Sequence, residues 1–115
     1  MMNENEVEIE KSVGLIIVEI IEYAPNSVMV KSIIKKSTGN ITAMSFDTGE
    51  EFTKRTSPFD TFVQIIDGKA EIVIDGISTS LDKGQSIVIP AHFSYNVKAN
   101  ERFKMILTII KSGYE

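Results

Sequence analysis

The sequence contains no cysteine and a single histidine, His92. Without cysteine, the chain cannot form disulfide bonds, a zinc–thiolate centre or a cysteine nucleophile. The absence of cysteine also fits a reducing compartment, and we expect the protein to be cytoplasmic. Since one histidine without a partner does not make a transition-metal site, the sequence offers little of the usual metal-binding chemistry.

Basic patches and long apolar runs are also missing. The 12 lysines and arginines are outnumbered by 16 acidic residues, which gives a net charge of −4. The basic residues occur as pairs rather than as a stripe, so we expect no nucleic-acid partner. The acidic N-terminus does not resemble a signal peptide, and the apolar run from Leu15 to Val18 is far shorter than the roughly 20 residues of a membrane span. We therefore expect no membrane partner.

The 115 residues fit one domain with one hydrophobic core. Residues 1–12 are predicted to form a polar, flexible tail, and residues 13–115 a single domain. Within the segment 14–23, Ile16, Ile17, Ile20 and Ile21 fall on one helical face, whereas the β-branched content favours a strand equally well. The sequence alone leaves both structures open for this segment.

From Ser27 onward, short β-rich runs alternate with turn residues, among them Asp-Gly pairs, which tolerate the positive φ of tight turns. The gaps are too short for the helical crossovers of a parallel sheet. The pattern therefore predicts an all-β antiparallel sandwich or barrel. Eight strands are expected, at residues 27–34, 41–46, 61–66, 70–74, 77–81, 86–89, 94–99 and 103–110.

Two of these runs are apolar on both faces. In residues 103–110, Phe103 and Met105 point to one side and Ile106 and Ile110 to the other, and residues 62–66 are similar. A strand that is apolar on both faces has a cover on each. The second cover is either another subunit, which predicts a homodimer, or the N-terminal segment folded over the sheet.

The spacing of glycines and prolines between Gly49 and Ala99 resembles the two motifs of the cupins. The first motif, G-x5-H-x-H-x3-E-x6-G, matches Gly49 to Gly68 in spacing, with Arg55, Ser57 and Thr61 at its ligand positions. The second, G-x5-P-x-G-x2-H-x3-N, begins at Gly84. In it Pro90 is kept, His92 takes the glycine position, Tyr95 the histidine position and Ala99 the asparagine position.

The resemblance covers about residues 27–110 and is greatest to the small single-domain cupins of the conserved-barrel type. It implies a double-stranded β-helix, or jelly roll, with a pocket inside the barrel, and small cupins are usually homodimers. The same resemblance implies a metal held by three imidazoles and one carboxylate.

The four ligand positions of this chain do not suit such a metal. Arg55 is cationic and has no lone pair to offer, and the hydroxyls of Ser57 and Thr61 are weak ligands. Tyr95 could ligate only as a phenolate, which forms near pH 10. We therefore predict degenerate metal motifs, no metal at the usual cupin site and no other cofactor.

Two arrangements of the pocket remain open. In the first, Arg55, Ser57, Thr61 and Tyr95 line a metal-free pocket that binds a small polar or anionic metabolite, since arginine can hold a carboxylate with two hydrogen bonds. In the second, Arg55 extends to the barrel mouth and apolar side chains fill the interior. The candidate walls are Met44, Phe46, Phe93 and Met105, with His92 at the rim.

Three functional hypotheses follow from these observations. The first is a non-enzymatic cupin that binds a small molecule. The second is an enzyme, for example an isomerase or cyclase with Tyr95 as acid, either metal-free or with a metal at an atypical place. The third is a non-catalytic dimeric scaffold module. The sequence contains no catalytic constellation that decides between them, although the absence of one favours the non-enzymatic hypotheses.

Overall fold

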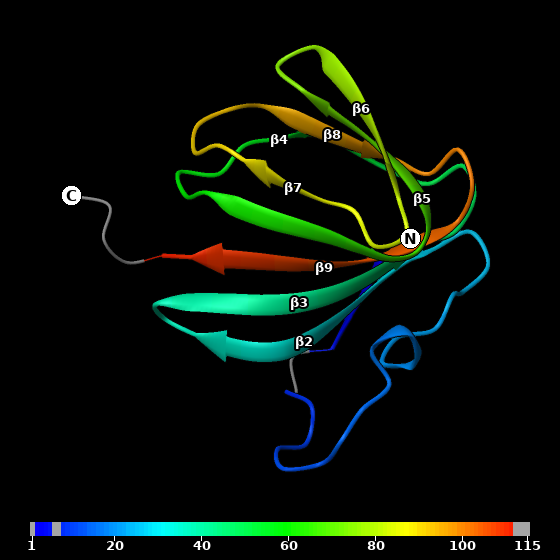
Figure 1. Cartoon of the computed structure of the whole chain (residues 1–115), viewed down its shortest axis with the longest axis vertical. Coiled ribbons are helices and arrows are strands. Elements are labelled where there is room, and N and C mark those ends of the chain that lie inside the picture. The colour runs from blue at the N-terminus through cyan, green and yellow to red at the C-terminus, as the bar shows by residue number, and fades with distance from the viewer. Residues whose placement is uncertain (1, 6–7, 112–115) are drawn as a thin grey trace.

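A computed structural model describes residues 2–5 and 8–111 of the chain, and its regular secondary structure is almost entirely β-strand (Figure 1). Apart from the strands it contains one short 3₁₀ helix, η1. The elements in chain order are β1 Met2–Asn5, η1 Ile17–Glu19, β2 Val28–Lys36, β3 Gly39–Phe46, β4 Glu51–Arg55, β5 Thr61–Ile74, β6 Ile77–Asp82, β7 Ser86–Ile89, β8 Tyr95–Lys98 and β9 Phe103–Ile110.

The strands form two sheets that share β5. The larger sheet has the order β1-β2-β3-β9-β5, with β7 on the other side of the first half of β5. The smaller sheet contains β4, β8, the second half of β5 and β6. All pairings are antiparallel except that of β1 with β2. The sheets curl over one another, as Figure 1 shows, and this arrangement confirms the predicted jelly roll.

The long strand β5 passes from one sheet to the other at Gly68. This glycine has φ +71°, and a Cβ added to it would lie 2.2 Å from the carbonyl oxygen of Arg102. Glycine is therefore required there by both its backbone angle and the close approach of β9. Two separate strands were predicted here, at 61–66 and 70–74, and that prediction is wrong because Asp67-Gly68 bends the strand without ending it.

Strand β1 was not predicted, and neither was β4. It pairs only with β8, and the register shifts between Phe52 and Arg55, where Lys54 has φ 48°. The N–H of Lys54 is bonded to the side chain of Asn96 instead of to the ladder. A short bulged edge strand does not show clean alternation, so the sequence pattern gave no signal for it.

The core lies between the two sheets. Phe46 and Phe103 stack with their ring centroids 4.7 Å apart, and Phe52 meets Phe46 edge-on at 5.0 Å. Met44, Met105, Ile65 and others complete this buried cluster between the sheets. These residues hold the sheets together by burying apolar surface.

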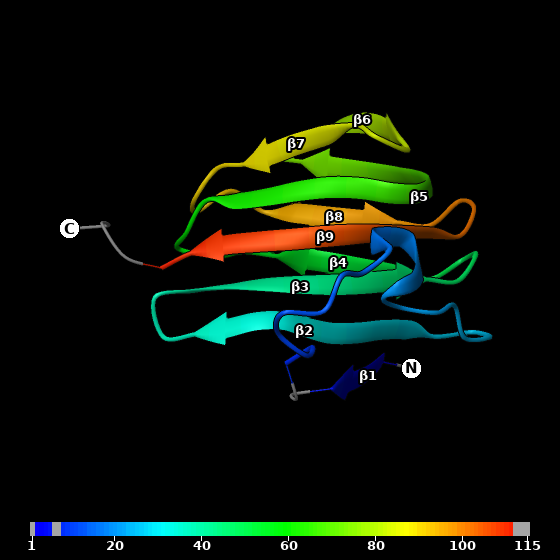
Figure 2. The same ribbon diagram turned by 60° about the horizontal axis from the view of Figure 1, so that its bottom comes forward.

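The N-terminal segment covers part of the outer face of the larger sheet (Figure 2). Ile20 and Ile21 are buried there against Ala43 and Ile106. Ser45 donates a hydrogen bond of 2.7 Å to the carbonyl oxygen of Glu22, and the buried Lys104 donates one of 2.6 Å to that of Val18. The N-terminal segment, one of the two alternatives for the second cover of these strands, therefore covers part of this face.

The expected helical face is only partly buried. Ile20 and Ile21 are buried, but Ile16 and Ile17 are 62% and 50% exposed. The segment forms a single 3₁₀ turn, so the period of an α-helix does not apply to it. Within the predicted tail, Met2–Asn5 form β1 beside Val28 to Lys31, and the flexibility of the tail stays a prediction. Among the residues described, no helix has the length and apolar character to cross a bilayer.

Candidate functional site

Three loops meet at one end of the barrel, which we call the mouth. The N–H of His92 donates to the carbonyl oxygen of Ser57 at 2.7 Å, and that of Asp75 donates to the carbonyl oxygen of Ser94 at 2.9 Å. In addition, the N–H of Ala91 donates to the carboxylate of Asp60 at 2.8 Å. The loops 56–60, 75–76 and 90–94 are therefore fastened to one another. The first and last of these loops lie side by side in Figure 1.

The backbone angle of His92 explains why the second motif has a glycine at this position. Its φ is 70°, in the left-handed region that favours glycine, and it occupies the glycine position of the motif. The side chain is exposed at the rim of the mouth. This residue therefore keeps the backbone shape of the motif while it adds an imidazole to the surface.

Four side chains from the four strands of the smaller sheet face the same side at the mouth. Arg55 lies opposite Tyr95, Tyr95 opposite Ile74, and Ile74 opposite Ile77. Residues that are direct partners in a ladder point to the same face. Because Tyr95 is buried in the core cluster, this is the inner face of the barrel. We call these four residues the mouth row.

Arg55 and Tyr95 differ in their environment. The guanidinium of Arg55 is exposed and stacks over the ring of Phe52, 4.2 Å from its centroid. Tyr95 is only 9% exposed. Burial raises the pKa of the Tyr95 phenol above its ordinary value, and the positive charge of Arg55 offsets only part of that effect. Tyr95 is therefore a neutral hydrogen-bond donor at physiological pH.

Thr61 lies at the same end of the barrel, because only residues 56–60 separate the end of β4 from the start of β5. It faces inward between Ile89 and Ile109 and is 1% exposed. Its hydroxyl oxygen is buried and has no hydrogen-bond partner among the residues described. A buried hydroxyl normally has a partner, so this atom calls for a physical explanation.

The other predicted site residues fall into two groups. Ser57 is half-buried, and its hydroxyl accepts a hydrogen bond of 3.1 Å from the N–H of Phe59, while Phe93 is 43% exposed at the rim. Met44, Phe46 and Met105 are buried in deeper rows of the larger sheet, where they pack as core. The structure thus brings Arg55, Ser57, Thr61, Tyr95, His92 and Phe93 to the mouth and places the two methionines and Phe46 below it.

Three residues that shape the mouth were not predicted as site residues. Ile74 and Ile77 flank the Asp75-Gly76 turn, and a two-residue hairpin places its flanking residues opposite each other. That rule could have found them. Phe52, which supports Arg55, lies in β4, which was not predicted.

The donor atoms at the mouth do not fit the metal that the cupin resemblance implies. Among residues 2–5 and 8–111, no group of three or more histidine and acidic side chains is arranged to hold a metal ion. The raised pKa of Tyr95 disfavours the phenolate that a metal would need, and Arg55 places a positive charge beside it. The residues at the mouth are suited to hydrogen bonding rather than to coordination.

Comparison with known proteins places the chain among small β-barrels. No protein-family model matches it, and no curated protein sequence does so either. Among solved structures, a conserved protein of unknown function from Streptococcus pyogenes is 30% identical, with a TM-score of 0.86 over 91% of this chain and 92% of that one. A cupin superfamily protein from Desulfitobacterium hafniense is 24% identical, with a TM-score of 0.84 over 90% and 95% of the two chains.

A further similar structure is a cupin 2 conserved barrel domain protein from Leptotrichia buccalis. It is 34% identical to this chain, with a TM-score of 0.79. The match covers 82% of this chain and 46% of that one, so this chain spans about half the length of the Leptotrichia protein. The agreement with all three structures extends over most of the barrel.

Proposed function

The chain belongs to the cupin superfamily as a small single-barrel member, and we propose that it binds a small polar or anionic metabolite at the mouth without a bound metal. The observation that carries this proposal is the buried, unpartnered hydroxyl of Thr61. Burying a hydroxyl without a hydrogen bond costs about 1–3 kcal/mol. A ligand that enters deeply enough to pair a polar atom with this hydroxyl would recover that free energy.

The chemical class of the metabolite follows from the other polar side chains at the mouth. Arg55 carries a permanent charge, and no acidic side chain among those described forms an ion pair with it. A guanidinium can hold a carboxylate through two parallel hydrogen bonds. Tyr95, which stays protonated, can donate a third hydrogen bond. These donors favour an anion over a neutral or cationic ligand.

The proposal is tested by thermal unfolding in the presence of small carboxylates, because a ligand that binds only the folded state raises its stability. We expect stabilisation of the wild-type protein and loss of that stabilisation in Arg55→Gln. Arg102→Gln is the matched control, since Arg102 also stacks on an aromatic ring, at 4.5 Å from the centroid of Tyr23, but belongs to the β8–β9 loop. Equal shifts in all three proteins, or none in any, would refute the proposal.

The metal-free state needs its own test. Elemental analysis of protein purified without added chelator should find no transition metal in stoichiometric amount. A stoichiometric metal that disappears in Tyr95→Phe would overturn our interpretation of the ligand positions.

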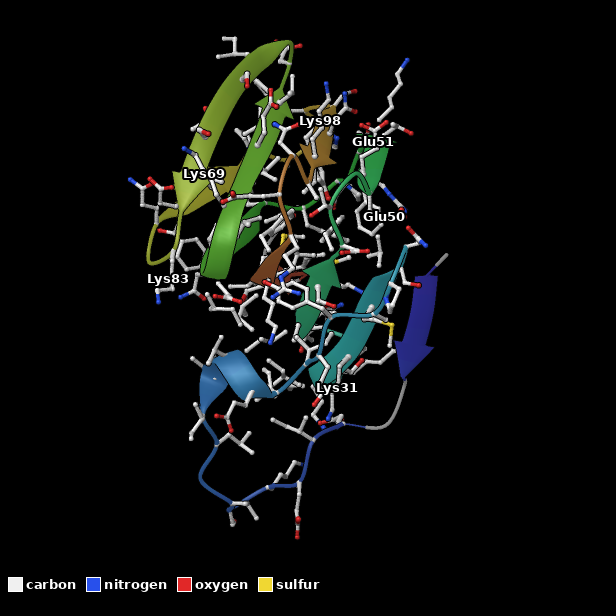
Figure 3. All side chains as sticks on the ribbon, turned by 90° about the vertical axis from the view of Figure 1, so that its right-hand side faces the viewer. Lys31, Glu50, Glu51, Lys69, Lys83 and Lys98 are labelled. Atoms are coloured by element: carbon white, nitrogen blue, oxygen red, sulfur yellow. The ribbon has the colours of Figure 1, made fainter. Side chains whose placement is uncertain are left out.

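A second candidate function, a dimeric module, is favoured by the contrast between the outer faces of the two sheets. The outer face of the smaller sheet is charged. Glu51 and Lys98, labelled in Figure 3, are direct partners there, and Lys98 is in turn the partner of Glu71. Hydrogen bonds from Ser78 and Asn100 hold the pKa of Glu71 below its ordinary value. This face is therefore adapted to water.

The outer face of the larger sheet is apolar beyond the area that the N-terminal segment covers. Phe62 pairs with Val88 on one side and with Thr108 on the other, and that row continues through Ile41 to Ile34. Val88 is 56% exposed, Ile34 40% and Phe62 38%. Apolar sheet faces pack well on one another, so we propose that a second copy of the chain covers this row.

Light scattering coupled to gel filtration tests the dimer. We expect about twice the chain mass of 12.8 kDa for the wild type and the monomer mass for Val88→Asp. Ile77→Asp is the control, because Ile77 is 71% exposed but lies at the mouth. A wild-type monomer, or a dimer unaffected by Val88→Asp, contradicts the proposed interface.

A further inference from the structure

The mouth row changes in character from one edge of the smaller sheet to the other. It begins with the charged Arg55, continues with the phenol of Tyr95 and ends with the aliphatic Ile74 and Ile77. Since neighbouring strands lie about 4.8 Å apart, the row of four residues spans about 14 Å. The mouth is therefore polar at one end and apolar at the other.

The apolar end is open to solvent. Ile77 is 71% exposed although it belongs to the inner face of the sheet, and Phe93 is 43% exposed. Phe93 lies close to that end, because Ser94, the next residue, accepts the hydrogen bond from Asp75 in the turn between Ile74 and Ile77. Exposed apolar side chains on an inward face are typical of a ligand-binding surface.

The charges at the two ends of the mouth row would orient a bound ligand. The exposed carboxylate of Asp75 lies in the turn at the apolar end of the row, whereas the guanidinium of Arg55 lies at the other edge of the sheet. An anionic group is therefore repelled from the Ile77 end and attracted to the Arg55 end. A ligand with one charge and an apolar body would fit the row in one direction only.

We propose that the metabolite is an amphiphilic monoanion, with its carboxylate on Arg55, a hydrogen bond from Tyr95 and its apolar body along Ile74 and Ile77 toward Phe93. This inference rests on the proposed function and adds the ligand class to it. Small, fully polar carboxylates use only the Arg55 end of the row. Apolar extension should therefore increase affinity until the body reaches the edge of the sheet.

The test is a series of straight-chain carboxylates, from acetate through butanoate and hexanoate to octanoate, titrated below their aggregation concentrations and followed by NMR or calorimetry. Each methylene that becomes buried should tighten binding about threefold to fourfold. Hexanol, which lacks the carboxylate, should bind far more weakly than hexanoate and should not respond to Arg55→Gln.

Substitutions at Ile77 and Arg55 test the contributions of the two ends of the mouth row to binding separately. Ile77→Thr should reduce the gain in affinity per methylene, and Ile16→Thr, at a comparably exposed position in the N-terminal segment, should leave it unchanged. Arg55→Gln should weaken every carboxylate by a similar factor and keep the dependence on length. Both threonine variants replace exposed side chains, so the fold should tolerate them.

The outcomes distinguish this inference from the proposed function. If acetate and octanoate bind equally well through Arg55, or if Ile77→Thr and Ile16→Thr behave alike, the amphiphilic class is wrong while the anion site stands. If no carboxylate binds, both are wrong.

Discussion

Replacing Thr61 by valine should make the ligand-free protein more stable. The two side chains have nearly the same shape, so Thr61→Val keeps the packing between Ile89 and Ile109 and removes only the hydroxyl. That hydroxyl is buried, in a residue that is 1% exposed, and has no partner among the residues described. A residue that weakens the fold at a candidate site is typical of a position kept for function.

The size of the effect follows from the cost of the unpaired group. An unsatisfied buried hydroxyl costs about 1–3 kcal/mol, and valine removes that cost. We expect the free energy of unfolding to rise by about 1 kcal/mol or more. For a domain of about 100 residues, 1 kcal/mol corresponds to a rise in Tm of about 4 °C.

A second buried hydroxyl provides a control of opposite sign. Ser45 is also fully buried, but its hydroxyl donates to the carbonyl oxygen of Glu22 at 2.7 Å. Ser45→Ala removes this hydrogen bond and leaves the carbonyl unpaired, so the protein should lose about 1 kcal/mol of stability. The two substitutions each remove one hydroxyl and differ in whether that hydroxyl had a partner.

Urea unfolding followed by far-UV circular dichroism measures both effects. Thr61→Val should raise the midpoint, Ser45→Ala should lower it, and Thr61→Val should also lose most of the stabilisation by carboxylates. If Thr61→Val destabilises the protein as much as Ser45→Ala does, the hydroxyl is already satisfied in the ligand-free state. In that case the main support for a ligand at this position is gone.

Two further predictions concern the bend of β5 and the loop that follows β3. Gly68→Ala should lower the free energy of unfolding by about 3 kcal/mol or more, because φ +71° is strained for alanine and the added Cβ would meet the backbone at the start of β9. Gly76→Ala, at φ +81° but with open space around it, should lower it by about 1 kcal/mol. Urea unfolding measures both losses, and equal losses would contradict the close approach of β9 to Gly68. The pKa of Asp47 is lowered by hydrogen bonds from the N–H groups of Asn26 and Thr48, so its stabilising effect is present above the ordinary pKa near 4 and is lost as the pH falls through the lowered value. Asp47→Asn should therefore be less stable than the wild type at pH 7, and it should lose less stability than the wild type when the pH falls below about 4. Parallel curves of unfolding free energy against pH for the two proteins would contradict this.

The turns of this fold were predictable from the sequence, but the path of β5 was not. Asp75-Gly76 and Asp67-Gly68 have the same residues, and both glycines have positive φ. The first pair closes a hairpin, whereas the second bends a strand that continues into the other sheet. The difference lies in the close approach of β9 to Gly68, a contact between segments distant in sequence that no local pattern contains.

The candidate site was predictable in its positions and not in its environments. Motif spacing selected Arg55, Thr61 and Tyr95, and all three lie at the mouth. The motif spacing does not distinguish the exposed Arg55 from the fully buried Thr61, because burial there depends on how the loop 56–60 crosses from one sheet to the other. The same limitation explains why Met44 and Met105 were expected as pocket walls although they pack as core.

The cupin motif in this chain constrains the backbone more than the chemistry of the site. His92 shows this directly, since it replaces glycine yet keeps the left-handed φ that the loop needs. The deeper rows, with Phe46 and Phe103, must stay apolar because they join the two sheets. The mouth row is needed neither for the backbone shape of the loop nor for joining the two sheets. It can exchange imidazoles for Arg55 and Tyr95 while the barrel is preserved, so the ligand of this protein has to be inferred from the side chains of the mouth and not from the motif around them.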